Sequence, residues 1–212
     1  MMFGKMKTLP ILLMLPMLLS ACHSKPAATP ERDTLASVVQ AAEQGDAKAQ
    51  MRMGIIYDNG LEGRLQDYAQ AARWYRMAAL QGLPEAQNNL AVLYKDGQGL
   101  PQDYAQAAHW FTLAARQGNV LAQSNLGWLY QSGNGVAQDF DSARHWYLLA
   151  ACQGHAAAQN NLATMYRDGQ GLKPNADSAR YWFEQAARQG MKLARRNLDR
   201  MNDSTITTTH NE

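Results

Sequence analysis

Tryptophan recurs at one fixed step in this chain, as Trp74, Trp110, Trp146 and Trp182 lie 36 positions apart. Glycine keeps the same step at a second position, which holds Gly82, Gly118, Gly154 and Gly190. Residues 88–100 and 160–172 are nearly identical, reading NNLAVLYKDGQGL and NNLATMYRDGQGL. A period of about 20 to 50 residues is the signature of a repeat array. The sequence therefore predicts four consecutive units between residues 47 and 190.

Each unit has the pattern of two helices joined by a glycine-rich loop. In the second unit, residues 86–94 place alanine and leucine at helical spacing, and the loop KDGQGLPQD follows. Residues 107–114 then repeat apolar side chains at i, i+3, i+4 and i+7. We expect Asp103 to cap this second helix and Gly118 to end it. Because no stretch shows the strict alternation of a half-buried strand, we predict an all-α fold.

Small side chains occupy one position of every unit, comprising Gly54, Ala91, Gly127 and Ala163. We expect these residues to let helices approach closely, while the periodic Trp and Tyr rings fill the space between units. Trp146 is accordingly predicted to be a core residue. One unit alone cannot bury its apolar face, whereas stacked neighbours can.

The repeated pattern A-x-x-x-L-[GA]-x-x-Y-x-x-G-x-G, followed by D-Y-x-x-A-x-x-W-[YF]-x-x-A-A-x-Q-G, resembles the Sel-one-like repeat, a relative of the tetratricopeptide repeat. The resemblance implies a right-handed α/α superhelical solenoid of four units, residues 47–190, whose first helices line a concave face. Residues 33–46 and 191–202 are then predicted to be capping helices. We expect the polar tail, 203–212, to be disordered.

The first 21 residues have the pattern of a lipoprotein signal peptide. Two lysines precede an apolar run that is shorter than the roughly 20 residues needed to span a membrane. The run ends in Leu-Ser-Ala-Cys, which resembles the bacterial lipobox, so Cys22 is expected to carry lipid and residues 22–32 to form a linker. The alternative is a plain secretory signal with a chance cysteine. His23 stands where Asp would favour inner-membrane retention, which favours the outer membrane, with the protein facing the periplasm.

Charge and cysteine content exclude some classes of protein. The chain has 20 Lys and Arg against 18 Asp and Glu, and loss of Lys5 and Lys7 with the leader leaves 18 of each sign. The basic stripe typical of nucleic-acid binding is not evident. Cys152 is expected to be a tolerated small residue, with a redox role in the oxidising periplasm as the alternative.

Catalytic motifs are missing from the sequence: it contains no G-x-S-x-G, S-x-x-K, H-E-x-x-H or phosphate-binding loop. His109 and His145 share one repeat position, but a metal site usually needs three or four ligands. We therefore predict no catalytic residue, no metal and no other cofactor. The alternative, by family association, is a periplasmic cell-wall-active or β-lactamase-like hydrolase. Family members linked to penicillin binding have a disulfide in each unit, and this chain lacks those cysteines.

A partner site is implied by the tetratricopeptide resemblance, because in that family four positions of each first helix point inward. We call these residues the inward stripe: Met51, Arg52, Ile55 and Asp58; Asn88, Asn89, Val92 and Lys95; Ser124, Asn125, Trp128 and Gln131; Asn160, Asn161, Thr164 and Arg167; and Arg196 and Asn197 of the cap. The candidate partner-binding residues among them are Arg52, Asn88, Asn89, Lys95, Asn125, Trp128, Asn160, Asn161 and Arg167.

Two features of the inward stripe each have two interpretations. The ladder of Asn89, Asn125, Asn161 and Asn197 either contacts the backbone of an extended peptide or bonds to neighbouring units. Trp128, where other units have Ile, Val or Thr, is either a binding anchor or packs on the adjacent unit. The sequence thus predicts a monomeric, non-enzymatic, lipid-anchored scaffold in the bacterial envelope that binds a protein or peptide. A purely structural spacer is a third possibility.

Overall fold

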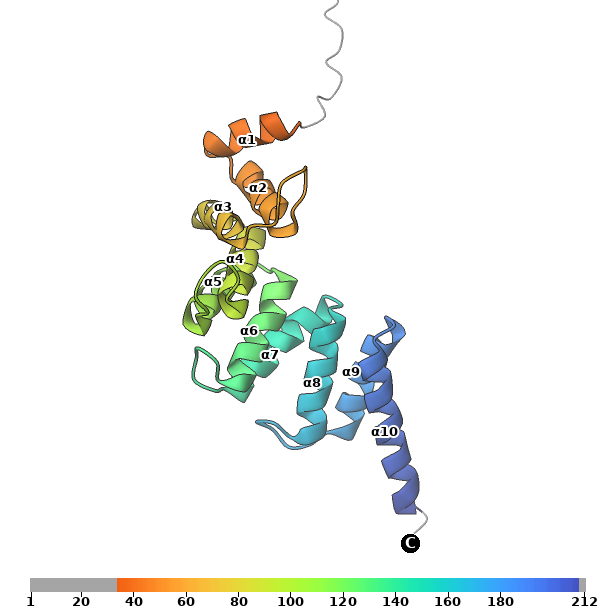
Figure 1. The fold of residues 1–212 in the computed structure, drawn as a ribbon. Helices are drawn as coiled ribbons and strands as arrows, with labels where there is room; N and C mark the ends of the chain where they lie inside the picture. Colours follow the sequence, from red (N-terminus) through yellow and green to blue (C-terminus); the bar gives the residue numbers. More distant parts are fainter. Residues whose placement is uncertain (1–33, 210–212) are drawn as a thin grey trace, which may run out of the picture. The chain divides into compact units, whose positions relative to one another are not determined.

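The computed structural model describes the backbone of residues 34–209 and the side chains of residues 34–202. The helices in this range are α1 (Leu35–Glu43), α2 (Ala47–Asn59), α3 (Tyr68–Leu80), α4 (Pro84–Asp96), α5 (Tyr104–Arg116), α6 (Val120–Ser132), α7 (Phe140–Cys152), α8 (Ala156–Asp168), α9 (Ala176–Arg188) and α10 (Lys192–Thr209). Each helix packs mainly against its neighbours in sequence (Figure 1). The predicted all-α solenoid of helix pairs is confirmed for the described part of the chain. The predicted signal peptide, Cys22 and the linker lie outside it.

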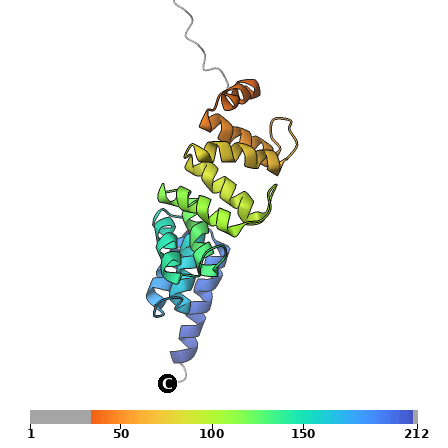
Figure 2. The same cartoon turned by 90° about the vertical axis from the view of Figure 1, so that its left-hand side faces the viewer.

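The helix ends follow the predicted signals. Asp103 caps α5 by accepting hydrogen bonds from the backbone N–H groups of Ala105 and Gln106, both at 2.9 Å. Gly118 lies two residues beyond the end of α5 with a φ of 88°, as predicted. The loop between α2 and α3 contains the additional residue of the first unit and extends beside these two helices in Figure 2.

The capping helices differ in length from the predicted ones. α1 is shorter than residues 33–46, because Asp46 already caps α2 through a 2.7 Å bond from the Ala49 N–H. α10 continues to Thr209, through residues that were expected to be disordered, since no glycine or proline interrupts it. In α10, Asp199 is exposed at the repeat position that holds Ala163 in α8. A carboxylate there disfavours burial under a further helix, which suits the last helix of an array.

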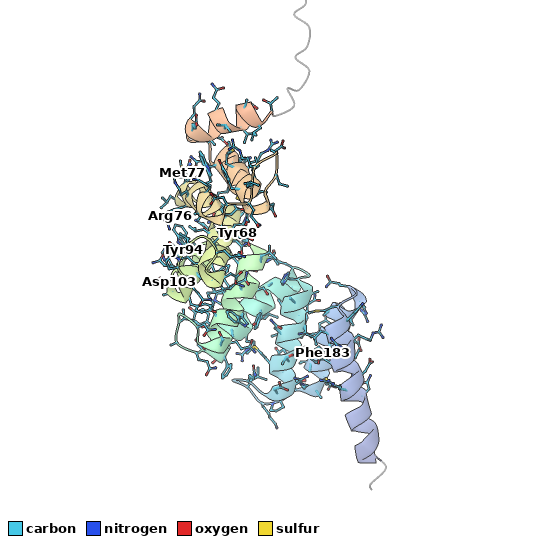
Figure 3. All side chains as sticks on the ribbon, viewed as in Figure 1. Tyr68, Arg76, Met77, Tyr94, Asp103 and Phe183 are labelled. Carbon is cyan, nitrogen blue, oxygen red and sulfur yellow. The ribbon has the colours of Figure 1, made fainter. Side chains whose placement is uncertain are left out.

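The fully buried rings are the residues that follow the periodic tryptophans, namely Tyr75, Phe111, Tyr147 and Phe183 (the last labelled in Figure 3). Trp146, predicted to be core, is only partly buried, and His145 stacks edge-on against it at 5.1 Å between ring centroids. The prediction that Trp146 is a core residue was therefore wrong by one position, because the core ring is Tyr147. On a helix of 3.6 residues per turn, one step rotates a side chain by about 100°. Tyr147 consequently faces α6, while Trp146 lies at the edge of the contact.

Small residues on the first helices make room for these rings, and the two positions vary together. A Cβ atom added at Gly127 would lie 2.8 Å from Cδ1 of Tyr147, and one at Gly54 would lie 2.3 Å from Cδ1 of Tyr75. The units with Phe111 and Phe183 instead have alanine at the small position. Each tyrosine hydroxyl donates a hydrogen bond to its own unit's first helix, Tyr75 to Asp58 at 2.9 Å and Tyr147 to Gln131 at 2.8 Å. Glycine thus accompanies a ring that is held by its hydroxyl.

Successive units are joined by buried glutamines at one repeat position: Gln50, Gln87, Gln123 and Gln159. Gln123 of α6 donates to the backbone carbonyl of Ala115 in α5 at 3.2 Å and accepts from the Gln153 side chain, just after α7, at 2.8 Å. The other three form the equivalent bonds. One buried amide therefore connects three consecutive helices in every unit.

The loops also hold successive units together. Gly99, with a φ of 66°, lies so close to the start of α3 that an added Cβ would be 2.3 Å from the carbonyl carbon of Tyr68. Arg76 of α3 donates a hydrogen bond to the hydroxyl of Tyr94 in α4, and both are labelled in Figure 3. The close approach of Gly99 explains why a glycine recurs at this loop position, because a side chain there would push two units apart.

The pairing of glycine with tyrosine predicts coupled effects of substitution. Gly127→Ala should lower the free energy of unfolding by about 1–3 kcal/mol, because the methyl group overpacks against Tyr147. Tyr147→Phe should cost about 1 kcal/mol through loss of the bond to Gln131. The double variant has the alanine–phenylalanine pair of α4 and α5, and its released ring can shift. It should therefore lose less than the sum in urea unfolding. Strictly additive losses would contradict this explanation.

Candidate functional site: the inward stripe

The inward stripe lies on α2, α4, α6, α8 and α10, and its residues differ in burial. Four are buried, at no more than 8% exposure: Asn88, Ser124, Asn160 and Asn197. Six of the candidate residues are partly exposed: Arg52, Asn89, Lys95, Asn125, Asn161 and Arg167. Trp128 is the most exposed of the candidates, at 37%. The structure therefore separates a buried row from a more accessible row on the same helices.

The asparagines do not bond to one another straight along the predicted ladder. Asn88 donates to Asn89 at 3.1 Å, and Asn160 donates to Asn161 at 3.4 Å. Asn197 donates to Asn160, one unit earlier, at 3.1 Å. Two of these hydrogen bonds join a buried asparagine to a partly exposed neighbour, and the third joins two buried asparagines of successive units. They satisfy some of the buried polar groups.

The tyrosine hydroxyls lie close to two asparagines of the ladder. The amides of Asn89 and Asn161 act to lower the pKa of Tyr75 and Tyr147, respectively, but the effect of burial is larger. Burial raises the pKa of both tyrosines well above the ordinary value, so both hydroxyls stay protonated. Asn125 stands at the equivalent position relative to Phe111, which has no hydroxyl. Asn125 forms no hydrogen bond through its side chain with any other described residue.

Positive charge on the inward stripe is partly neutralised from within. Lys95 forms an ion pair with the adjacent Asp96 at 3.1 Å. Arg167 binds both carboxylate oxygens of Asp168, at 2.6 and 2.9 Å, and this hydrogen bonding lowers the pKa of Asp168. The Arg167 guanidinium also lies 5.8 Å from the ring centre of Phe183. The stripe therefore offers more hydrogen-bonding and apolar surface than free charge.

The packing interpretation of Trp128 is confirmed, and its role as a binding anchor stays a prediction. Its ring packs on the preceding unit, with 6.1 Å between its centroid and that of Tyr104 and 48° between the ring planes. More than a third of the residue nevertheless stays exposed. Trp128 stands out in the sequence because the repeat does not require it. The roles of Tyr75 and Tyr147 were not predicted, although the alternation of Tyr with Phe after each tryptophan is visible in the sequence.

Other candidate features lie away from the inward stripe. His109 and His145 stack edge-on against Trp110 and Trp146, and within residues 34–202 no group of three or more His, Cys, Asp or Glu side chains could hold a metal ion. Cys152 is exposed at the end of α7. A hollow of about 980 Å³ is lined by the loops from α1 to α2 and from α3 to α4. Over the described range, none of the helices has both the length and the apolarity to cross a bilayer.

The family follows from the match to the repeats. A model of the Sel1 repeat family matches residues 47–83, 84–119, 120–155 and 156–191. These matches cover more than half of the chain and coincide with the helix pairs from α2–α3 to α8–α9. The chain belongs to the Sel1 repeat family, whose repeats generally mediate protein–protein interaction. No curated protein matches the chain.

Solved structures share the architecture. A Sel1 repeat protein from Oxalobacter formigenes is 35% identical with a TM-score of 0.72, over 77% of this chain and 65% of that one. A protective antigen of uropathogenic Escherichia coli with an SLR fold is 35% identical with a TM-score of 0.57, over 81% and 44%. The chain therefore spans less than two thirds of either protein. An immunity protein from Pseudomonas aeruginosa shares the fold at 23% identity and a TM-score of 0.50, over 76% and 59%.

Proposed function

We propose that this protein is a non-enzymatic scaffold that binds a protein or peptide partner through the inward stripe. The exposed ring of Trp128 carries the proposal. Stacking does not require a tryptophan there, since the same position holds Val92 in α4 and Thr164 in α8. Tryptophans that lie partly exposed on an otherwise polar surface are typical binding anchors. Membership of a family whose repeats generally mediate protein–protein interaction supports the same function.

The chemistry of the stripe favours a partner that is recognised by hydrogen bonds and apolar contact. Lys95 and Arg167 already have acidic partners, so a strongly acidic ligand would compete with Asp96 and Asp168. The amide of Asn125 can both donate and accept, which suits a peptide backbone. Trp128, one turn further along α6, offers a flat apolar surface on the same helix face.

We further propose that the protein is held in the bacterial envelope by lipid on Cys22, at the outer membrane and facing the periplasm. The support is the sequence Leu-Ser-Ala-Cys at the end of the apolar run, followed by His23. One acyl chain alone gives only marginal membrane binding, so an anchor of several chains would be needed for stable attachment.

The anchor is tested by changing its cysteine. Wild-type protein should sediment with membranes and be released by detergent. The Cys22→Ser variant should either keep its signal peptide or be absent from the membrane fraction that detergent extracts. Cys152→Ser is the matched control and should fractionate like the wild type, because Cys152 lies at an exposed helix end. Fractionation of membranes and periplasm, followed by mass measurement of the mature N-terminus, gives the result. Wild-type protein found in the soluble periplasm would refute the anchor.

The partner-binding function is tested by separating stability from capture. Trp128→Ala should lower the free energy of unfolding clearly less than Phe111→Ala, which should cost about 3–5 kcal/mol, because Trp128 is 37% exposed and Phe111 is fully buried. After crosslinking in intact cells, the amount of partner recovered with Trp128→Ala should be at least tenfold lower than with the wild type. A tenfold loss of affinity corresponds to about 1.4 kcal/mol of binding free energy.

The control for this experiment is Leu148→Ala, which changes a residue that is 39% exposed on the second helix α7. It should recover the partner at the wild-type level. Equal recovery by Trp128→Ala and wild type would contradict binding at the inward stripe. Turnover of a penicillin-type or cell-wall substrate by the purified protein would contradict the non-enzymatic assignment.

A further inference from the structure

The turn between α9 and α10 has a hollow, which we call the end pocket. It has a volume of about 570 Å³ and is lined by Ala187, Gly190, Met191, Lys192, Arg195 and Arg196. In the earlier units, the alanines equivalent to Ala187 are each 2% exposed, namely Ala79, Ala115 and Ala151. The bridging glutamine and the end of the next second helix cover them there. α10 is the last helix of the described chain (Figure 1), and Ala187 is partly exposed.

Three cations surround the end pocket at positions that are neutral in the preceding unit. Arg195 stands at the position of the buried bridging glutamines. Arg196 replaces Asn160, and Lys192 replaces Ala156. All three cations are exposed, and within residues 34–202 none of them forms an ion pair. The end pocket therefore combines a small apolar floor with positive charge that the fold does not neutralise.

The end of a repeat array needs a polar outer face, but it does not need charge of one sign. Side chains of both signs would keep the end soluble equally well. Like charges at i and i+4 weaken a helix, and Lys192 and Arg196 are such a pair. The first turn of α10 has no acidic residue to offset them. The positive charge at this turn thus disfavours the fold by itself, and an anionic ligand would remove the repulsion.

The size of the ligand is limited by Asp199, which is exposed one turn beyond Arg195 on α10. In the earlier units the equivalent position lies under the ring of a full-length second helix, as Gly127 lies under Tyr147. A carboxylate there disfavours burial under another helix of that length. It would also repel an acidic segment that continued along α10. The end pocket therefore fits a short segment that stays at the first turn of the helix.

We propose that the end pocket binds a short acidic peptide segment with one apolar side chain. The apolar side chain lies on Ala187, Gly190 and Met191, and flanking carboxylates pair with Lys192, Arg195 and Arg196. This site goes beyond the proposed function, because Arg196 alone of these residues belongs to the inward stripe. Binding at the end pocket then requires both negative charge and an apolar group on the ligand.

The probe is a dye-labelled, capped pentapeptide of four glutamates around a central leucine. Full-length protein in detergent is titrated with it by fluorescence anisotropy at about 0.15 M salt, where distant surface charges are screened. Replacing the glutamates by glutamines should weaken binding roughly tenfold, because three cations lose their partners. Replacing the leucine by serine should also weaken it roughly tenfold, because the apolar floor stays uncovered.

Two results with these peptides would overturn the end pocket. Equal affinities of the glutamate and glutamine peptides would remove the role of the cations. Equal affinities of the leucine and serine peptides would indicate a surface that responds to charge alone, as in contact with anionic lipid.

The variant test compares two arginines of α10 with the same change of charge. Arg195→Gln introduces the residue of the earlier units, so it should melt no lower than the wild type while the glutamate–leucine peptide binds about fivefold more weakly. Arg200→Gln, an exposed change outside the end pocket, should alter affinity less than about twofold. Equal losses in the two variants, or none in Arg195→Gln, would overturn the proposal. If the end pocket fails but Trp128→Ala still weakens partner capture in cells, the proposed function stands without it.

Discussion

The buried glutamine of each unit is the constraint on which the array depends. Removing an amide side chain from water is unfavourable unless its donors and acceptor are paired. Gln123 meets this condition only when α5, α6 and the end of α7 are all in place, since its partners are Ala115 and Gln153. The same arrangement occurs at Gln50, Gln87 and Gln159, so one unit in the wrong register would leave buried amides unpaired on both sides. The 36-residue step is therefore set by hydrogen bonding as well as by apolar packing.

This constraint separates the surfaces used for stacking from the surface that we propose for recognition. The second helices use their buried rings, and the loop glycines their close approach, to hold successive units together. Because Tyr and Phe alternate on the second helices, Asn89 and Asn161 of the first helices lie near tyrosine hydroxyls, whereas Asn125 stands at the equivalent position relative to Phe111. Trp128 lies one turn beyond Asn125 on the same helix. The irregular residues of the repeat thus gather where the stacking bonds are incomplete, which is where partner recognition is least costly to the fold.

Much of the fold could be predicted from the sequence, because periodicity, Asp103 as a cap and Gly118 as a helix end are local signals. That Tyr147 and not Trp146 is the core ring could not be predicted, because it depends on how each second helix is rotated about its axis relative to the first helix. The asparagine bonds could not be predicted either. Asn88 and Asn160 have the same neighbours in sequence, and only the structure shows that Oδ1 of Asn160 accepts from Asn197 while Oδ1 of Asn88 has no partner among the described residues. The extension of α10 to Thr209 was missed because polar composition alone was read as disorder.

Hydrogen exchange on Gln123→Leu tests most directly whether the glutamine bridge couples three helices. Loss of the bridge removes two hydrogen bonds, one to the Ala115 carbonyl and one from the Gln153 amide, at a cost of about 1–3 kcal/mol in total. The account predicts faster exchange of the amides in α5, α6 and α7 together, by roughly 5- to 150-fold where exchange follows unfolding of these helices. Gln106→Leu, an exposed change on α5, should leave exchange at the wild-type rate. Faster exchange confined to α6, or none in either variant, would contradict a bridge that holds the units in register.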